Sequence, residues 1–173
     1  MKKSLAALAL AAWLPLVLAL APGNPAPEFS AKNQDGKVVR LSDFAGKPVL
    51  IYFYPKDETP GCTQEACSLR DEFTKFRKLG AVVLGVSTQG EASHKEFKAH
   101  HKLPFDLLVD QDGKVAKAMG VESIEGAGIH KRESVLLGPD HKVIRVYRDV
   151  DPSRHAAQVL HDLEQAQGPI PKT

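Results

Sequence analysis

The sequence is poor in the features that define several classes of protein. Aromatic residues make up only 6% of its 173 residues, and no internal repeat or low-complexity block is visible. No block of lysine and arginine is present, and without residues 1–21 the acidic and basic side chains balance. A nucleic-acid partner is therefore not expected. The remaining composition, 43% hydrophobic and 25% charged, is typical of one globular domain.

Cysteine is also scarce, because the chain has only Cys62 and Cys67. Their spacing differs from Cys-x-x-Cys, which disfavours both a metal-binding pair and a dithiol oxidoreductase of that type. A structural disulfide stays open as an alternative, beside a reactive thiol. The stretch from Tyr52 to Asp71, which contains both cysteines, is therefore expected to carry the reactive site of the chain.

The first 21 residues are typical of a secretory signal. Lysines at positions 2 and 3 give a positive start, and an almost wholly apolar run from Leu5 to Leu20 follows. The run is short for a membrane span and contains Pro15, although an uncleaved N-terminal anchor is an alternative. We therefore expect an exported, periplasmic or extracytoplasmic protein, in which a disulfide can persist. Its domain would span residues 22–167, followed by a tail at 168–173.

Hydrophobic patterns and turn residues divide this domain into strands and helices. Val49 to Tyr54 is continuously apolar and rich in β-forming residues, which predicts a central strand covered on both faces. A helix is predicted from Pro60 to Leu79, and a second buried strand from Ala81 to Val86. Because strand, helix and strand follow one another, the two strands are expected to pair in parallel.

The remaining segments are shorter. The expected strands and hairpins are Phe29 to Leu41, turning at Asn33 to Gly36, then Phe105 to Val109, Ser134 to Leu137 and Lys142 to Tyr147. The expected helices are Glu91 to His101, Lys114 to Met119 and a last one with Asp151 as N-cap. Glu122 to Lys131 is expected to be a loop, and the seven histidines to be solvated surface residues. The element order indicates an α/β, thioredoxin-like fold with a mixed central sheet flanked by helices and an N-terminal hairpin.

Thr59-Pro60 is a strong helix-start signal. The residue before proline is pushed out of helical geometry, and proline loses no hydrogen bond at the first helical position. With Thr59 as N-cap, Cys62 is the third helical residue, so its sulfur is expected near unpaired backbone N–H groups and the positive helix end. This location favours the thiolate, which is the nucleophilic form of cysteine.

The five-residue gap between the cysteines limits when they can bond. Positions i and i+5 of a regular helix lie about 8.6 Å apart between Cα atoms, with side chains about 140° apart. A disulfide needs Cα atoms within about 7 Å. Cys62 and Cys67 therefore cannot bond while the helix is intact, and a bond requires its first turns to unwind.

The pattern Pro55-x-x-x-Thr59-x-x-Cys62, with Cys67 five residues later, resembles the peroxiredoxins, and specifically the bacterioferritin-comigratory-protein or Q subfamily. The similarity covers roughly Pro25 to Leu163. Supporting matches are Ala26-Pro27-Glu28-Phe29, Leu41-Ser42-Asp43-Phe44, Gly46-Lys47-Pro48-Val49, Tyr52-Phe53-Tyr54-Pro55 and Leu69-Arg70-Asp71.

The resemblance implies a role for each residue of the motif. Cys62 would attack peroxide and become a sulfenic acid, and Cys67 would resolve it to an intramolecular disulfide. Thr59 would orient the peroxide and Pro55 would shield the sulfenate. The family also uses an arginine on a later strand, which Arg132 matches in Arg132-Glu133-Ser134, while the adjacent Lys131 is a rival cation.

The sequence thus predicts a thiol peroxidase for hydrogen peroxide and organic hydroperoxides, with no metal, haem or flavin. A thioredoxin-like dithiol protein is the expected reductant, and a monomer or weak dimer the expected assembly. Two alternatives stay open. One is a thiol enzyme like glutathione peroxidase, and the other is a non-catalytic secreted domain with a structural disulfide.

Overall fold

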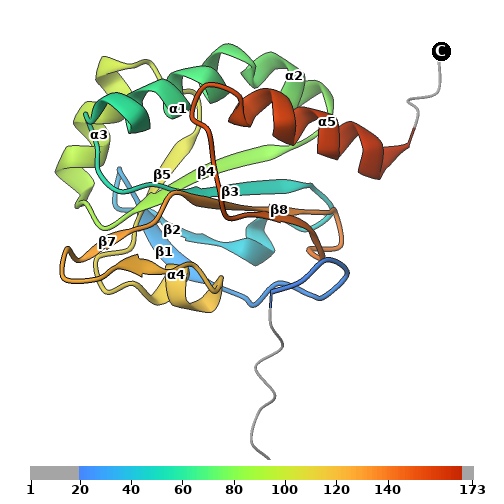
Figure 1. Ribbon diagram of the computed structural model, residues 1–173, viewed down its shortest axis with the longest axis horizontal. Coiled ribbons are helices and arrows are strands. Elements are labelled where there is room, and N and C mark those ends of the chain that lie inside the picture. Colours follow the sequence, from blue (N-terminus) through green and yellow to red (C-terminus); the bar gives the residue numbers. More distant parts are fainter. Residues whose placement is uncertain (1–19, 169–173) are drawn as a thin grey trace, which may run out of the picture.

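The computed structural model describes residues 20–168 of the chain. Its centre is a seven-stranded sheet with the strand order β2-β1-β5-β4-β3-β8-β9 (Figure 1). The strands are β1 Ser30–Asn33, β2 Val38–Arg40, β3 Val49–Phe53, β4 Val82–Ser87, β5 Asp106–Val109, β8 Glu133–Leu137 and β9 Val143–Tyr147. A separate two-stranded hairpin pairs β6 Ser123–Ile124 with β7 Ile129–His130.

The apolar strand β3 lies inside the sheet, between β4 and β8, and all five of its residues are buried. It pairs in parallel with β4 and antiparallel with β8, so the sheet is mixed, as predicted. Successive side chains of a strand point to opposite faces. Leu50 and Tyr52 therefore contribute to one hydrophobic core, and Val49 and Ile51 to another on the opposite face.

Helices cover both faces of the sheet. They are α1 Pro60–Asp71, α2 Phe73–Lys78, α3 Glu91–His100, α4 Lys114–Ala118 and α5 His155–Gln167, with a short 3-10 helix at Leu41–Phe44. Figure 1 shows α1, α2 and α5 on one face and α4 on the other. The predicted mixed sheet flanked by helices, with an N-terminal hairpin formed by β1 and β2, is confirmed.

The predicted single helix from Pro60 to Leu79 is wrong in one respect, because it is divided at Glu72. Glu72 has φ −91° and ψ 2°, outside the usual helical values, and its carbonyl accepts the N–H of Lys75 three residues later. The chain therefore tightens at this point and resumes as α2. No proline or glycine marks this division in the sequence.

Two further boundaries differ from the predictions. Asp151 does not cap α5. Its side chain instead accepts the N–H and the hydroxyl of Ser153, which closes a separate turn before the helix begins at His155. The predicted loop from Glu122 to Lys131 contains the hairpin β6–β7, held by the N–H of Lys131 on the carbonyl of Glu122.

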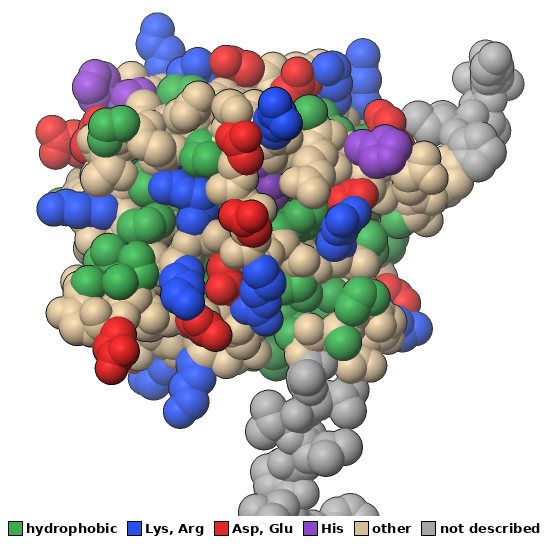
Figure 2. All heavy atoms as spheres, viewed as in Figure 1, with side chains coloured by type: hydrophobic (Ala, Val, Ile, Leu, Met, Phe, Trp, Pro, Cys, Tyr) green, Lys and Arg blue, Asp and Glu red, His purple; other side chains and the backbone are tan. Residues whose placement is uncertain are grey.

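The predicted leader at 1–21 lies almost entirely outside the described residues, and so does most of the predicted tail at 168–173. Between residues 20 and 168, no helix has the length and apolar character to cross a membrane. Figure 2 shows acidic and basic side chains interspersed on the face in view.

Candidate active site

The N-terminal end of α1 carries the first cysteine. Thr59 has the extended conformation of an N-cap residue and Pro60 opens the helix, so Cys62 is its third residue, as predicted. The Thr59 hydroxyl makes no capping bond to the helix and donates instead to the carbonyl of Lys56 at 2.9 Å. Pro55 follows β3 and lies partly buried at the start of this loop.

Cys62 lies against a guanidinium group. Its side chain is only 1% exposed, and Nη2 of Arg132 lies 3.3 Å from its sulfur. Arg132 directly precedes β8, where the antiparallel register pairs Glu133 with Phe53 at the end of β3. The register therefore brings Arg132 beside the loop that leads into α1. Gly61 makes room for it, because a Cβ there would lie 3.1 Å from Nη2.

The rival cation Lys131 points to a different partner. Its ammonium group forms an ion pair with Glu122, and about half of its side chain is exposed. Of the two adjacent cations, the structure thus places Arg132 at the sulfur.

Behind Arg132 lies a buried acid that sequence reasoning missed. Glu65 is fully buried, and its Oε2 accepts a hydrogen bond from Nη1 of Arg132 at 2.5 Å. Burial raises the pKa of Glu65 to about 7, against the opposing effect of Arg132. Arg132 therefore has one nitrogen fixed by Glu65 and another directed at Cys62.

His155 completes this buried group from the start of α5. Its Nε2 lies 2.9 Å from the Ser134 hydroxyl and 3.9 Å from Oε1 of Glu65. Burial, together with the nearby charge of Arg132, lowers the pKa of His155 to about 4. The ring is consequently neutral at pH 7, so Arg132 is the cation of this cluster.

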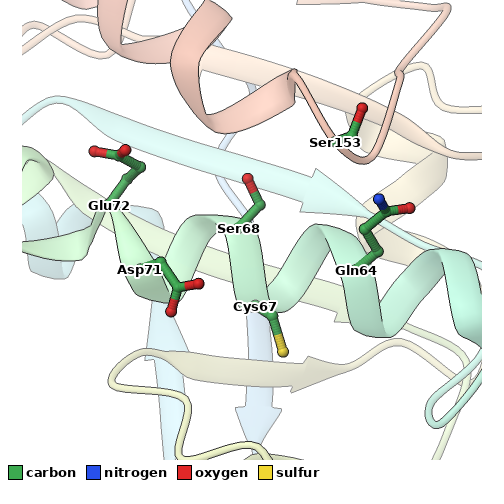
Figure 3. A pocket seen from close by; sticks show the side chains of 6 residues that line it. All are labelled: Gln64, Cys67, Ser68, Asp71, Glu72 and Ser153. Atoms are coloured by element: carbon green, nitrogen blue, oxygen red, sulfur yellow. The ribbon is translucent and has the colours of Figure 1, made fainter.

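The second cysteine faces another side of α1. Figure 3 shows Cys67 leaving the helix in the opposite direction from Ser68, in a hollow also lined by Gln64 and by Ser153 from the turn before α5. Both cysteines are free, and α1 is continuous between them. The structure is therefore that of the dithiol form, and it does not bring Cys62 and Cys67 together.

A polar network fixes the loop that precedes α1. The buried carboxylate of Asp57 accepts hydrogen bonds from Tyr54 at 2.7 Å and Ser93 at 2.6 Å, and lies 2.9 Å from Nδ1 of His94. Burial alone would raise the pKa of Asp57, but the hydrogen bonds from His94, Ser93 and Tyr54 outweigh it and lower the pKa. The ionised carboxylate thus ties this loop to α3.

The prediction that the histidines are solvated is wrong for three of them. His94, His130 and His155 are buried, and each has a polar partner in the core. These partners are Asp57 for His94, Asp110 for His130 and Ser134 for His155. A signal was available for Glu65. It lies three residues after Cys62, on the face of α1 that also carries the buried Ala66 and Leu69.

Residues 22–146 match the AhpC/TSA family. Chloroplastic peroxiredoxin Q of Suaeda salsa is 44% identical over 150 residues, which are 86% of this chain and 70% of that protein. Peroxiredoxin Bcp of Bacillus subtilis is 41% identical over 148 residues, covering 82% of this chain and 94% of that protein. Chloroplastic peroxiredoxin Q of Oryza sativa is 45% identical, and the chain spans 66% of its length.

These relatives contradict the predicted export. The plant proteins are chloroplastic, and none of the three relatives carries a name that indicates a periplasmic or secreted protein. A positive start followed by an apolar run is therefore not enough to assign this protein to the periplasm. The argument from an oxidising compartment falls with it, and the redox chemistry is inferred from the site alone.

Solved structures agree with the family match. Peroxidoxin BcpB of Mycobacterium tuberculosis superposes with a TM-score of 0.78 at 31% identity, covering 83% of this chain and 96% of that one. The bacterioferritin comigratory protein of Xanthomonas campestris gives 0.74 at 32% identity, covering 81% and 92%. The thioredoxin-like fold of peroxiredoxins is thereby confirmed. The chain belongs to the AhpC/TSA family, in its peroxiredoxin Q and Bcp group.

Proposed function

We propose that this protein is a thiol peroxidase that reduces hydrogen peroxide and organic hydroperoxides, with Cys62 as the peroxidatic residue. The observation that carries the proposal is the 3.3 Å contact between Nη2 of Arg132 and the Cys62 sulfur, at the start of a helix. A guanidinium and the positive end of a helix both stabilise a thiolate. They also offer hydrogen-bond donors to a peroxide oxygen beside the sulfur.

The first step oxidises the sulfur. The Cys62 thiolate attacks one peroxide oxygen, the O–O bond breaks, and the second oxygen leaves as water or an alcohol after taking a proton from solvent. Cys62 becomes a sulfenic acid. Arg132 stabilises the negative charge that develops on the leaving oxygen, because Glu65 holds its guanidinium in place before the reaction begins. Thr59, whose carbonyl accepts a hydrogen bond from the N–H of Thr63, would orient the peroxide. Pro55 would shield the sulfenate.

The second step joins the two cysteines. Cys67 attacks the sulfenic sulfur, which expels the oxygen as water and forms an intramolecular disulfide. Because both residues lie in one continuous helix, the first turns of α1 must unwind for the sulfurs to meet. The bond needs no second chain, which is consistent with a monomer or weak dimer. A thioredoxin-like dithiol protein would reduce it, and no metal, haem or flavin takes part.

Organic hydroperoxides are proposed as substrates because of the activity of a related protein. The related bacterioferritin comigratory protein of Xanthomonas campestris is described as having alkyl peroxide reduction activity.

The test is peroxide consumption by purified protein with thioredoxin or glutathione as reductant. Cys62→Ser should abolish consumption, and Cys67→Ser should keep the first turnover but lose recycling by dithiols. Mass mapping after one equivalent of peroxide should show a Cys62–Cys67 bond in the wild type. Peroxidase activity retained by Cys62→Ser would refute the mechanism, and an unimpaired steady state in Cys67→Ser would refute the resolving role.

A further inference from the structure

A second group of polar residues surrounds Cys67, and the first step of the proposed reaction does not use it. Nδ1 of His101 lies 3.9 Å from the Cys67 sulfur. On the other side of the same ring, Nε2 lies 3.0 Å from Oε2 of Glu58. A thiol, an imidazole and a carboxylate thus follow one another in a line, which is the arrangement of an activated nucleophile with its base and its orienting acid.

The ring of His101 is held in position by its surroundings. His101 is the C-cap residue that directly follows α3, and its side chain is only 16% exposed. The ring packs edge-on against Phe97 with centroids 5.0 Å apart, and the carbonyl of His101 accepts a hydrogen bond from Nη1 of Arg70 at 2.8 Å. Arg70 lies on α1 one turn after Cys67, so the same helix carries the thiol and fixes the histidine.

The contact with Glu58 sets the proton on the ring. A carboxylate only accepts hydrogen bonds, so Nε2 must carry the hydrogen that it donates to Glu58. In the neutral ring, Nδ1 then has a free lone pair, and this is the nitrogen that faces the sulfur. The hydrogen bond from His101 lowers the pKa of Glu58, with His100 contributing in the same direction, so the carboxylate is ionised at neutral pH.

We propose that His101 is the general base that activates the resolving cysteine, with Glu58 as the residue that positions it. The inference rests on the proposed function, because it concerns the attack of Cys67 on the Cys62 sulfenic acid. His101 Nδ1 takes the proton of the Cys67 thiol, the S–S bond forms as the S–O bond of Cys62 breaks, and the departing hydroxide becomes water with that proton. The sulfenic acid supplies the oxidising equivalent, so no further oxidant is needed.

The arrangement survives the unwinding that resolution requires. Glu58 lies before the helix and is held by its two oxygens, one on His101 and the other 3.1 Å from Nδ1 of His100. It adopts φ +59°, an unusual value for a residue with a side chain, which the surrounding contacts must maintain. The segment between Glu58 and Cys67 can therefore unwind and carry Cys62 to Cys67, while the thiol stays with its base.

The charged and titratable groups that face His101 come from three segments. They are Glu58 from the loop before α1, His100 from α3, and Cys67 and Arg70 from α1. The rate gain that a base at Cys67 can give has an upper limit. An ordinary thiol with a pKa near 8.5 is about 3% ionised at pH 7, so a base that makes the thiolate available increases the rate by at most about thirtyfold. The advantage should vanish near pH 9.5, where an ordinary thiol is already mostly ionised.

The experiment follows one turnover of the reduced full-length protein by quench-flow and intact mass. Sulfenic acid at Cys62 and the later disulfide differ by one water, so formation and resolution are measured separately. His101→Gln should form the sulfenic acid at the wild-type rate but resolve it about ten- to thirtyfold more slowly at pH 7 and about equally fast at pH 9.5. Added imidazole should restore resolution in His101→Ala.

The matched control is His161→Gln, which removes an exposed imidazole from α5, and it should resolve within about twofold of wild type. Three results would overturn the proposal: wild-type resolution in His101→Gln, a rate loss of the same size at every pH, or no rescue by imidazole. Failure of the wild type to form any sulfenic acid would instead refute the proposed function, so the two failures are distinguishable.

Discussion

Replacing Arg132 by methionine tests the electrostatic basis of the site, because it removes the cation but keeps a side chain of similar length. Two unit charges 3.3 Å apart attract by about 5 kcal/mol at an effective dielectric constant of about 20. Arg132 is partly exposed, so water recovers a share of this energy, and we expect a net loss of about 2–3 kcal/mol. The rate of sulfenic acid formation should fall by about 30- to 150-fold.

The same substitution leaves Glu65 without its cation, which would confuse a loss of catalysis with a loss of stability. Removing one partner of a buried ion pair destabilises by about 3–5 kcal/mol when the other stays charged. Glu65 has a pKa of about 7 even beside Arg132, so it will protonate instead, and the cost will be smaller and will grow with pH. The double variant Arg132→Met, Glu65→Gln removes the orphaned acid.

The assay has two readouts on four proteins. Quench-flow with peroxide gives the rate of sulfenic acid formation, and urea unfolding gives stability. The double variant should recover stability but not rate, whereas Lys131→Met should keep the wild-type rate because Lys131 pairs with Glu122. A double variant that reacts within about threefold of wild type, or a Lys131→Met protein as slow as Arg132→Met, would refute the reasoning.

The remaining predictions concern the supporting residues. Glu65, with its pKa raised from 4.5 to about 7, makes the unfolding free energy fall as pH rises through that window, whereas His155, lowered from 6.5 to about 4, makes it fall as pH drops. Urea titrations from pH 4.5 to 6.5 should therefore show stability rising with pH in Glu65→Gln and falling with pH in His155→Gln; equal slopes would contradict this. Gly61→Ala should slow sulfenic acid formation about tenfold with little loss of stability, because its Cβ displaces Arg132. A wild-type rate in quench-flow would contradict this prediction. Asp57→Asn should lower the urea-unfolding free energy by about 2–4 kcal/mol, and an unchanged midpoint would exclude the network.

The parts of the fold that the sequence predicts well are those with strong local signals. The continuous apolar run of β3 and the Thr59-Pro60 helix start both appear as predicted. The division of the helix at Glu72 and the late start of α5 at His155 were not predictable. In both places the outcome depends on which of several neighbouring hydrogen bonds forms, and local propensity does not decide between them.

The site divides in the same way. Cys62, Cys67 and Thr59 lie within one short motif, so their spacing alone places them on the first turns of α1. Choosing Arg132 over Lys131 needed the pairing of β8 with β3, which is a long-range contact. The buried histidines were missed for the same reason. A histidine in a polar segment has no local mark of burial, because its partner, such as Asp57 for His94, is distant in the chain.

The carboxylate of Asp57 also determines how far a redox change can spread. It anchors the loop to Tyr54 at the end of β3 and to α3, and Glu58 next to it binds the end of the same helix. We therefore expect the first turns of α1 to move on oxidation while the sheet stays fixed. Amide exchange should then differ between the dithiol and oxidised proteins in that segment alone. A reducing partner would distinguish the oxidised protein from the dithiol protein by the unwound first turns of α1, because the rest of the surface is the same in both states.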